Sequence, residues 1–169
     1  MKMGTSLVAA GAMLVISATA VAAQDYAMAA PRGPDAKVTR ADELKQEAEA
    51  LFSNPKHWKK AQRLLIESAE MRDGADEKAY TCYMMAGRLA AVLGDNESAR
   101  ESLEKAAEHA LARGALLDAA SAFIDAAHAA ARTGDREAVE ELTERASLLA
   151  SAPRLTDQER NAIRERLGA

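Results

Sequence analysis

The 169-residue sequence contains little of what β-sheets require. Aromatic residues make up 4% of the chain and β-branched residues are scarce, whereas alanine dominates the 49% of residues that are hydrophobic. Strands favour aromatic and β-branched side chains, and alanine is the strongest helix former. The composition therefore predicts an all-α fold, with closely spaced helices and a few larger side chains as fillers of the core.

Cysteine is almost absent as well, and Cys82 has no second cysteine with which to form an intramolecular disulfide. It lies on a helical pattern beside Tyr83, Met84 and Met85. This setting favours a small buried apolar residue over a reactive thiol. A reactive thiol needs an activating neighbour, and only Arg88 is close enough in sequence to serve.

The chain also lacks an excess of positive charge, since its formal net charge is −4. Proteins that bind nucleic acids usually carry a basic surface, so we expect no nucleic-acid partner. The sequence contains no Gly-rich phosphate loop, and no serine or cysteine stands near a histidine as a nucleophile would. We therefore expect neither an enzyme nor a bound cofactor.

The amino terminus has the pattern of a secretory signal peptide over residues 1–23. Lys2 supplies a positive start, residues 7–21 form an apolar run, and small residues follow it. Cleavage after Ala22 or Ala23 would export the protein to the periplasm or the medium. The alternative is an uncleaved membrane anchor, although the run is shorter than the ~20 residues that usually span a bilayer. No cysteine follows the run, which excludes a lipoprotein anchor.

Residues 24–39 show no periodicity and contain two prolines and a glycine, which predicts a flexible linker. The folded domain is expected over residues 40–169. Apolar residues there recur at spacings of three and four, the period of an amphipathic helix. Breaks at Pro55, Gly74, Gly94, Gly114 and Pro153 predict helices at 39 or 42 to 52, 56–72, 76–93, 95–113, 115–133 and 135–151, followed by a last amphipathic helix that opens at Thr156.

Two of these helical pairs repeat one another at an offset of 40 residues. In each, an aromatic residue and a small residue precede a Gly-Asp pair, and small or large apolar residues follow. Glycine can end one helix in the left-handed conformation, and aspartate can cap the next. The first unit has Tyr83, Gly87, Gly94, Asp95, Ala99, Leu103 and Ala106, and the second has Phe123, Ala127, Gly134, Asp135, Ala138, Leu142 and Ala146, in which Ala138 and Leu142 stand one residue early.

A weaker unit precedes them, with Trp58 as an expected core anchor near its start. The order and spacing of these residues resemble the tetratricopeptide repeat (TPR) family over about Ala41 to Ala152. The period of 40 is longer than that family's usual repeat of about 34 residues. The resemblance implies a right-handed solenoid of antiparallel helical hairpins, with about three pairs and a C-terminal capping helix.

The resemblance further implies that the first helix of each pair lines a concave groove that holds a peptide or a partner helix. Arg88 and His128 occupy equivalent places and are expected to be neighbours, and Arg88 and Arg132 could meet a carboxylate of the partner. The alternative is an ordinary solvated helix face. The predicted groove residues are Met84, Arg88, Ser121, Asp125, His128 and Arg132, together with Thr81, Ala91 and Asp118.

Asp125 and His128 also stand one helical turn apart, as metal ligands do. The sequence has no His-Glu-x-x-His motif and no second carboxylate-x-x-His motif, so we expect no metal. The leading hypothesis is a non-catalytic scaffold for a protein or peptide. One alternative is a structural envelope component that self-associates through its open ends, and another is a helical protein that binds a small ligand or a metal.

Overall fold

The computed structural model describes residues 34–72, 74 and 76–168, and the described part consists of helices joined by turns, with no strand. The predicted signal peptide at 1–23 and residues 24–33 of the predicted linker lie outside it. None of the described helices is both long and apolar enough to cross a bilayer. The elements are α1 (Pro34–Ala50), a 3-10 turn (Pro55–His57), α2 (Trp58–Glu70), α3 (Glu77–Val92), α4 (Asn96–Ala112), α5 (Leu116–Thr133), α6 (Arg136–Ala150) and α7 (Asp157–Leu167).

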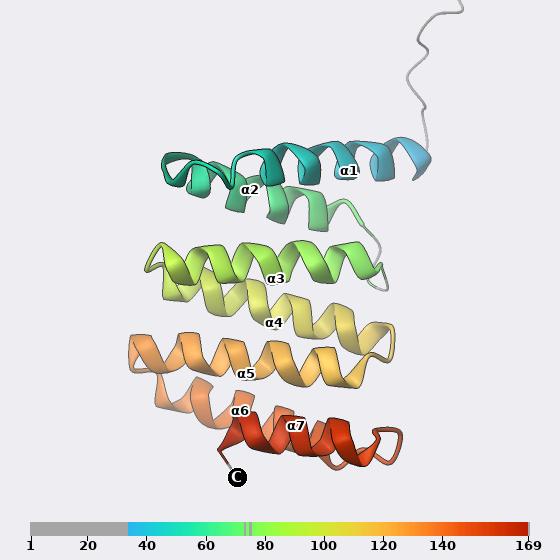
Figure 1. Cartoon of the computed structure of the whole chain (residues 1–169), viewed down its shortest axis with the longest axis vertical. Coiled ribbons are helices and arrows are strands. Elements are labelled where there is room, and N and C mark those ends of the chain that lie inside the picture. The colour runs from blue at the N-terminus through green and yellow to red at the C-terminus, as the bar shows by residue number, and fades with distance from the viewer. Residues whose placement is uncertain (1–33, 73, 75, 169) are drawn as a thin grey trace, which may run out of the picture. The chain divides into compact units, whose positions relative to one another are not determined.

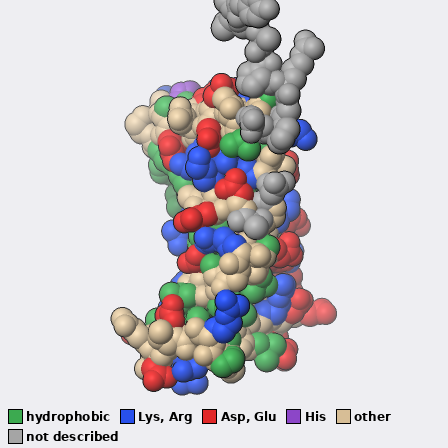
Figure 2. Space-filling view, turned by 90° about the vertical axis from the view of Figure 1, so that its right-hand side faces the viewer, with side chains coloured by type: hydrophobic (Ala, Val, Ile, Leu, Met, Phe, Trp, Pro, Cys, Tyr) green, Lys and Arg blue, Asp and Glu red, His purple; other side chains and the backbone are tan. Residues whose placement is uncertain are grey.

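Each helix packs against the next one along the chain, and α5 also contacts α7. Figure 1 shows the helices as a ladder of antiparallel neighbours in two layers, with α1, α3, α5 and α7 in front and α2, α4 and α6 behind. The all-α prediction is confirmed. The surface drawn in Figure 2 carries Lys and Arg side chains interspersed with Asp and Glu.

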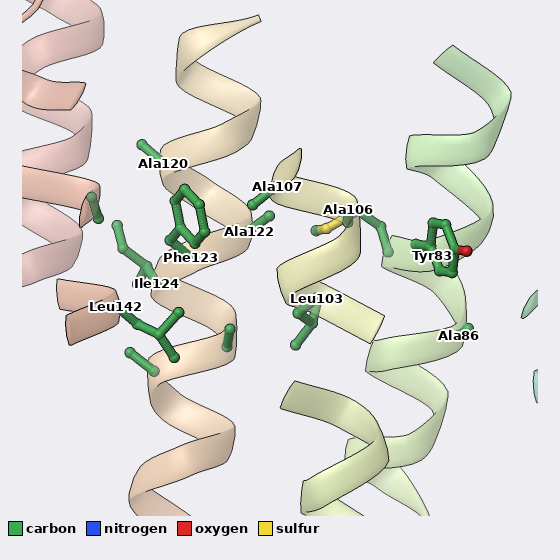
Figure 3. Packing of buried hydrophobic residues seen from close by; sticks show 14 of the residues in the cluster. Tyr83, Ala86, Leu103, Ala106, Ala107, Ala120, Ala122, Phe123, Ile124 and Leu142 are labelled. Atoms are coloured by element: carbon green, nitrogen blue, oxygen red, sulfur yellow. The ribbon is translucent and has the colours of Figure 1, made fainter. Parts of the chain in front are cut away.

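Alanine forms most of the core and lets the helices approach closely. Figure 3 shows Ala107 of α4 lying beside Ala122 of α5. Phe123 is 1% exposed, and the guanidinium carbon of Arg145 lies 4.1 Å from the centre of its ring. The few large side chains thus fill the spaces that the alanines leave, as the composition predicts.

The two Gly-Asp pairs act as expected. Gly94 and Gly134 have φ angles of +80° and +79°, in the left-handed region that glycine adopts without steric cost. The side chain of Asp95 accepts a hydrogen bond from the Ser98 amide, and Asp135 accepts one from the Ala138 amide. Each aspartate satisfies a backbone N–H that the helix itself leaves unpaired.

The first helix begins earlier than predicted. It starts at Pro34, so residues 34–39 of the expected linker are helical. Proline is well suited to the first helical position because it has no N–H to leave unpaired there. Neither Thr39 nor Asp42 begins the helix. Asp42 instead accepts hydrogen bonds from Arg72 and Lys78.

The second helix begins later than predicted, because Asn54 caps a 3-10 turn that precedes Trp58. Trp58 is half-buried, and its Nε1 donates to the Phe52 carbonyl at 3.0 Å. Cys82 is completely buried, as expected, and its Sγ lies 3.6 Å from the Ser68 hydroxyl. Burial raises the pKa of Cys82, so the thiol stays protonated at neutral pH.

Candidate partner-binding site

A hollow of about 350 Å³ lies between α3, α5 and α7, three helices of the front layer in Figure 1. Its floor includes Ile163, which is 1% exposed, and its edge includes two arginines. The lining residues are Tyr80, Met84 and Arg88 of α3, Leu117, Asp118 and Ser121 of α5, and Ala162, Ile163 and Arg166 of α7.

Asp125 connects the three helices at the edge of this hollow. Its Oδ2 lies 3.4 Å from Nη2 of Arg88, and its Oδ1 lies 2.5 Å from Nη2 of Arg166. The Asp125 side chain is 20% exposed, whereas those of Arg88 and Arg166 are 67% and 39% exposed. Because one carboxylate faces two guanidinium groups, this cluster carries one positive charge in excess. The exposed fractions of Arg88 and Arg166 leave both arginines accessible to a ligand.

A second group of contacts closes the opposite side of the hollow. The guanidinium carbon of Arg113 lies 4.9 Å from the centre of the Tyr80 ring, and its Nη2 lies 2.5 Å from Asp118. Partial burial, together with the charge of Asp118, raises the pKa of Tyr80, so its phenol stays neutral at physiological pH. These contacts hold Tyr80 and Asp118 in place on adjacent helices.

The predicted groove residues fall into two groups. Met84, Arg88 and Ser121 line the hollow, and Asp125 is joined to it through Arg88 and Arg166. Met84 is only 6% exposed and belongs mainly to the core. Ser121 is half-buried, which leaves part of its side chain accessible.

His128 and Arg132 stand farther along α5, outside the lining of the hollow. Both are exposed, and neither forms an ion pair within the described residues. The arginine that stands with Arg88 at Asp125 is Arg166, whereas Arg132, which was expected to bind a partner carboxylate together with Arg88, does not line the hollow.

The groove residues predicted from the sequence include none from α7. The sequence predicts an amphipathic helix that opens at Thr156, and Leu155 and Ile163 are indeed buried. That signal predicts a packed helix but does not say that the helix contacts α5. Arg166 reaches Asp125 only because α7 lies beside α5 as well as α6.

The hollow presents charged, apolar and hydroxyl side chains to a ligand. Among the described residues, no group of three or more His, Cys, Asp or Glu side chains is arranged to hold a metal ion. Asp125, one of the two residues considered as metal ligands, is in contact with two arginines. Arginine's planar guanidinium suits a carboxylate, which it can bind through two parallel hydrogen bonds.

Comparison of the chain with models of protein families, with curated protein sequences and with solved structures gives no match in any of the three.

Proposed function

We propose that this chain is an exported, non-catalytic scaffold that binds a segment of another protein or peptide in the hollow between α3, α5 and α7. The observation that carries the proposal is the pair of accessible arginines, Arg88 and Arg166, around the single carboxylate of Asp125. A carboxylate of the partner would add a second negative charge to this cluster and pair with both arginines. Tyr80, Leu117 and Ser121 would contact the rest of the segment.

The architecture that supports this proposal is a right-handed, TPR-like solenoid of three helical hairpins, α1–α2, α3–α4 and α5–α6, followed by α7. The arguments for it are the 40-residue offset between Gly94-Asp95 and Gly134-Asp135 and the packing of consecutive helices. In such an arrangement α3 and α5 would line the concave surface. α7 would then take the place of the first helix of a further pair.

The test uses a photo-crosslinking amino acid at position 121 of the full chain, expressed in its native host. We expect a discrete crosslinked partner band that disappears in Arg88→Glu/Arg166→Glu. The matched control is Arg63→Glu/Arg164→Glu, which makes the same charge change at two exposed arginines outside the hollow. A band that persists unchanged in Arg88→Glu/Arg166→Glu would reject the hollow as the site.

Export is a separate part of the proposal and has its own test. Mass spectrometry of the protein purified from its host should find a chain that begins at Ala23 or Gln24. A chain that still begins at Met1 would contradict cleavage and favour the membrane anchor. This result would not bear on the proposed binding site, because the hollow lies entirely within residues 80–166.

A further inference from the structure

A second depression, of about 1020 Å³, runs along the outer side of α6. It does not share a residue with the hollow between α3, α5 and α7. We call it the α6 groove. Its lining comprises Ala131 of α5, the turn residues Gly134 and Asp135, and one stripe of α6 formed by Arg136, Val139, Glu140, Thr143, Glu144, Ser147 and Leu148.

The residues of α4 that correspond to this stripe of α6 are more deeply buried. α4 and α6 are capped by Asp95 and Asp135, so their residues correspond at an offset of 40. Three positions of α4 are fully or almost fully buried, whereas the corresponding positions of α6 are partly or fully exposed. Counted from the caps, and not by the sequence match in which Ala138 and Leu142 stand one residue early, these pairs are Ala99 and Val139, Leu103 and Thr143, and Ala107 and Ser147.

The helix that covers α4 is α5, and its last turns provide part of the cover. Ala99 of α4 packs against Ala129 of α5 and Ala90 of α3. In the next hairpin the place of α5 is taken by α7, which packs on α6. The α6 groove is thus the part of α6 that corresponds to a covered surface of α4.

α7 is too short to complete this cover. Counted from the capping residues Ala115 and Thr156, the last residue of α7, Leu167, corresponds to Ala126 of α5. α5 continues from there to Thr133, whereas α7 is closed by Gly168 in the left-handed conformation. The missing length is about two helical turns. It includes the position equivalent to Ala129.

The charges at the groove indicate what kind of helix would fit. Glu140 and Glu144 stand one turn apart on the same edge, and both are exposed. Neither has an ion-pair partner anywhere in residues 34–72, 74 and 76–168. With Asp135 they outnumber Arg136, the one basic residue of the lining. At the other end, Leu148 is 66% exposed and offers an apolar contact.

We propose that the α6 groove binds an amphipathic helix of another protein, about two turns long, with small apolar residues on one face and Lys or Arg residues beside Glu140 and Glu144. The small residues would lie on Val139, Thr143 and Ser147, as α5 lies on Ala99 and Ala107 of α4. A long side chain at one end would contact Leu148. This surface is separate from the proposed partner site and does not depend on it.

The test measures binding of a stapled helical peptide of about three turns to the full chain by fluorescence anisotropy. The peptide carries an alanine stripe flanked by lysines, and a second peptide has glutamates in place of the lysines. We expect the basic peptide to bind, with affinity that falls as salt is raised, and the acidic peptide not to bind. Glu140→Lys/Glu144→Lys should weaken binding at least about tenfold, because like charges would face one another.

Two further variants test whether the groove itself, and not the overall charge of the protein, determines the affinity for the basic peptide. Ser147→Trp fills the groove at an exposed position without adding charge and should also weaken binding. Glu101→Lys/Glu108→Lys makes the same change in charge on α4, outside the groove, and should not alter the affinity.

Three results would overturn the proposal. They are equal binding of both peptides, equal binding by the groove variants and wild type, and no binding of the basic peptide. Sedimentation velocity provides a further check. A wild-type dimer that Ser147→Trp converts to a monomer would show that a second copy of this chain occupies the groove, and the proposed partner helix would then be wrong.

Discussion

Arg72 and Asp42 form an ion pair between the end of α2 and the middle of α1. Nη2 of Arg72 lies 2.5 Å from Oδ1 of Asp42, and the Arg72 side chain is completely buried. Its Nη1 also lies 3.2 Å from Asp76, the residue that caps α3. One guanidinium group therefore joins α1, α2 and α3.

We expect Asp42→Ala to lower the free energy of unfolding by about 1–3 kcal/mol, because a buried guanidinium would lose one of its two carboxylate partners. Urea denaturation measures the change. Glu43→Ala is the control, since Glu43 is exposed and its one ion pair within the described residues is with Arg40; it should cost no more than about 0.5 kcal/mol. Equal effects of the two substitutions would show that the Arg72–Asp42 pair does not stabilise the fold.

The same pair predicts a dependence of stability on pH. Hydrogen bonds from Arg72, and then from Lys78, lower the pKa of Asp42 below its ordinary value of 3.8. A carboxylate with a lowered pKa in the folded state binds protons more readily when the chain is unfolded. Its stabilising contribution is therefore fully present above pH 3.8 and is lost as the pH falls through the lower, folded value.

The measurement compares the free energies of unfolding of wild type and Asp42→Asn between about pH 6 and pH 2. The difference between them should be constant at the upper end and should shrink below about pH 4. The comparison with Asp42→Asn is needed because Glu47 and Glu159 also have lowered pKa values and are present in both proteins. A difference that stays constant down to pH 2 would assign the acid sensitivity to those other carboxyl groups.

Local signals in the sequence predicted the helices and their turns, because each Gly-Asp pair acts on its own neighbours. The contact between Arg72 and Asp42 could not be predicted in this way, since it depends on how three helices meet. The same holds for Arg166, whose position depends on the course of α7. Pro34 was ambiguous for a different reason: proline disrupts the interior of a helix but suits its first turn, and only the structure shows that it begins α1.

Gly87 allows α3 and α4 to approach closely. A Cβ atom added there would lie 2.6 Å from Cγ of Leu103 and 3.1 Å from the Ala99 carbonyl oxygen. We expect Gly87→Ala to destabilise the protein by about 1–2 kcal/mol, because the overlap costs about 1–3 kcal/mol and exceeds the gain in helix propensity of up to about 1 kcal/mol.

A double-mutant cycle in urea tests this explanation of Gly87. Leu103→Ala removes the overlapping side chain, so Gly87→Ala should cost less in that background than in wild type. The control is Gly74→Ala, at a position where an added Cβ atom has no neighbour within 4 Å and the backbone is not in the left-handed region. A cost of Gly87→Ala that is unchanged by Leu103→Ala would mean that the contact with Leu103 is not its cause.

The attachment of α7 decides whether Arg166 can be tested as part of a binding site. Ile163 is 1% exposed and packs in the main core, whereas Arg166 pairs with Asp125 at a partly exposed position. We expect Ile163→Ala to cost about 2–5 kcal/mol, since it leaves a cavity in the core. Arg166→Ala should cost only about 0.2–1 kcal/mol, the usual range for exposed ion pairs.

Both values are measured by urea denaturation, and hydrogen exchange of the α7 amides reports whether the helix stays docked. Protection should be lost in Ile163→Ala and kept in Arg166→Ala. If Arg166→Ala also releases α7, the Asp125 pair holds the helix in place, and a loss of partner binding on changing Arg166 would no longer identify a contact with the partner.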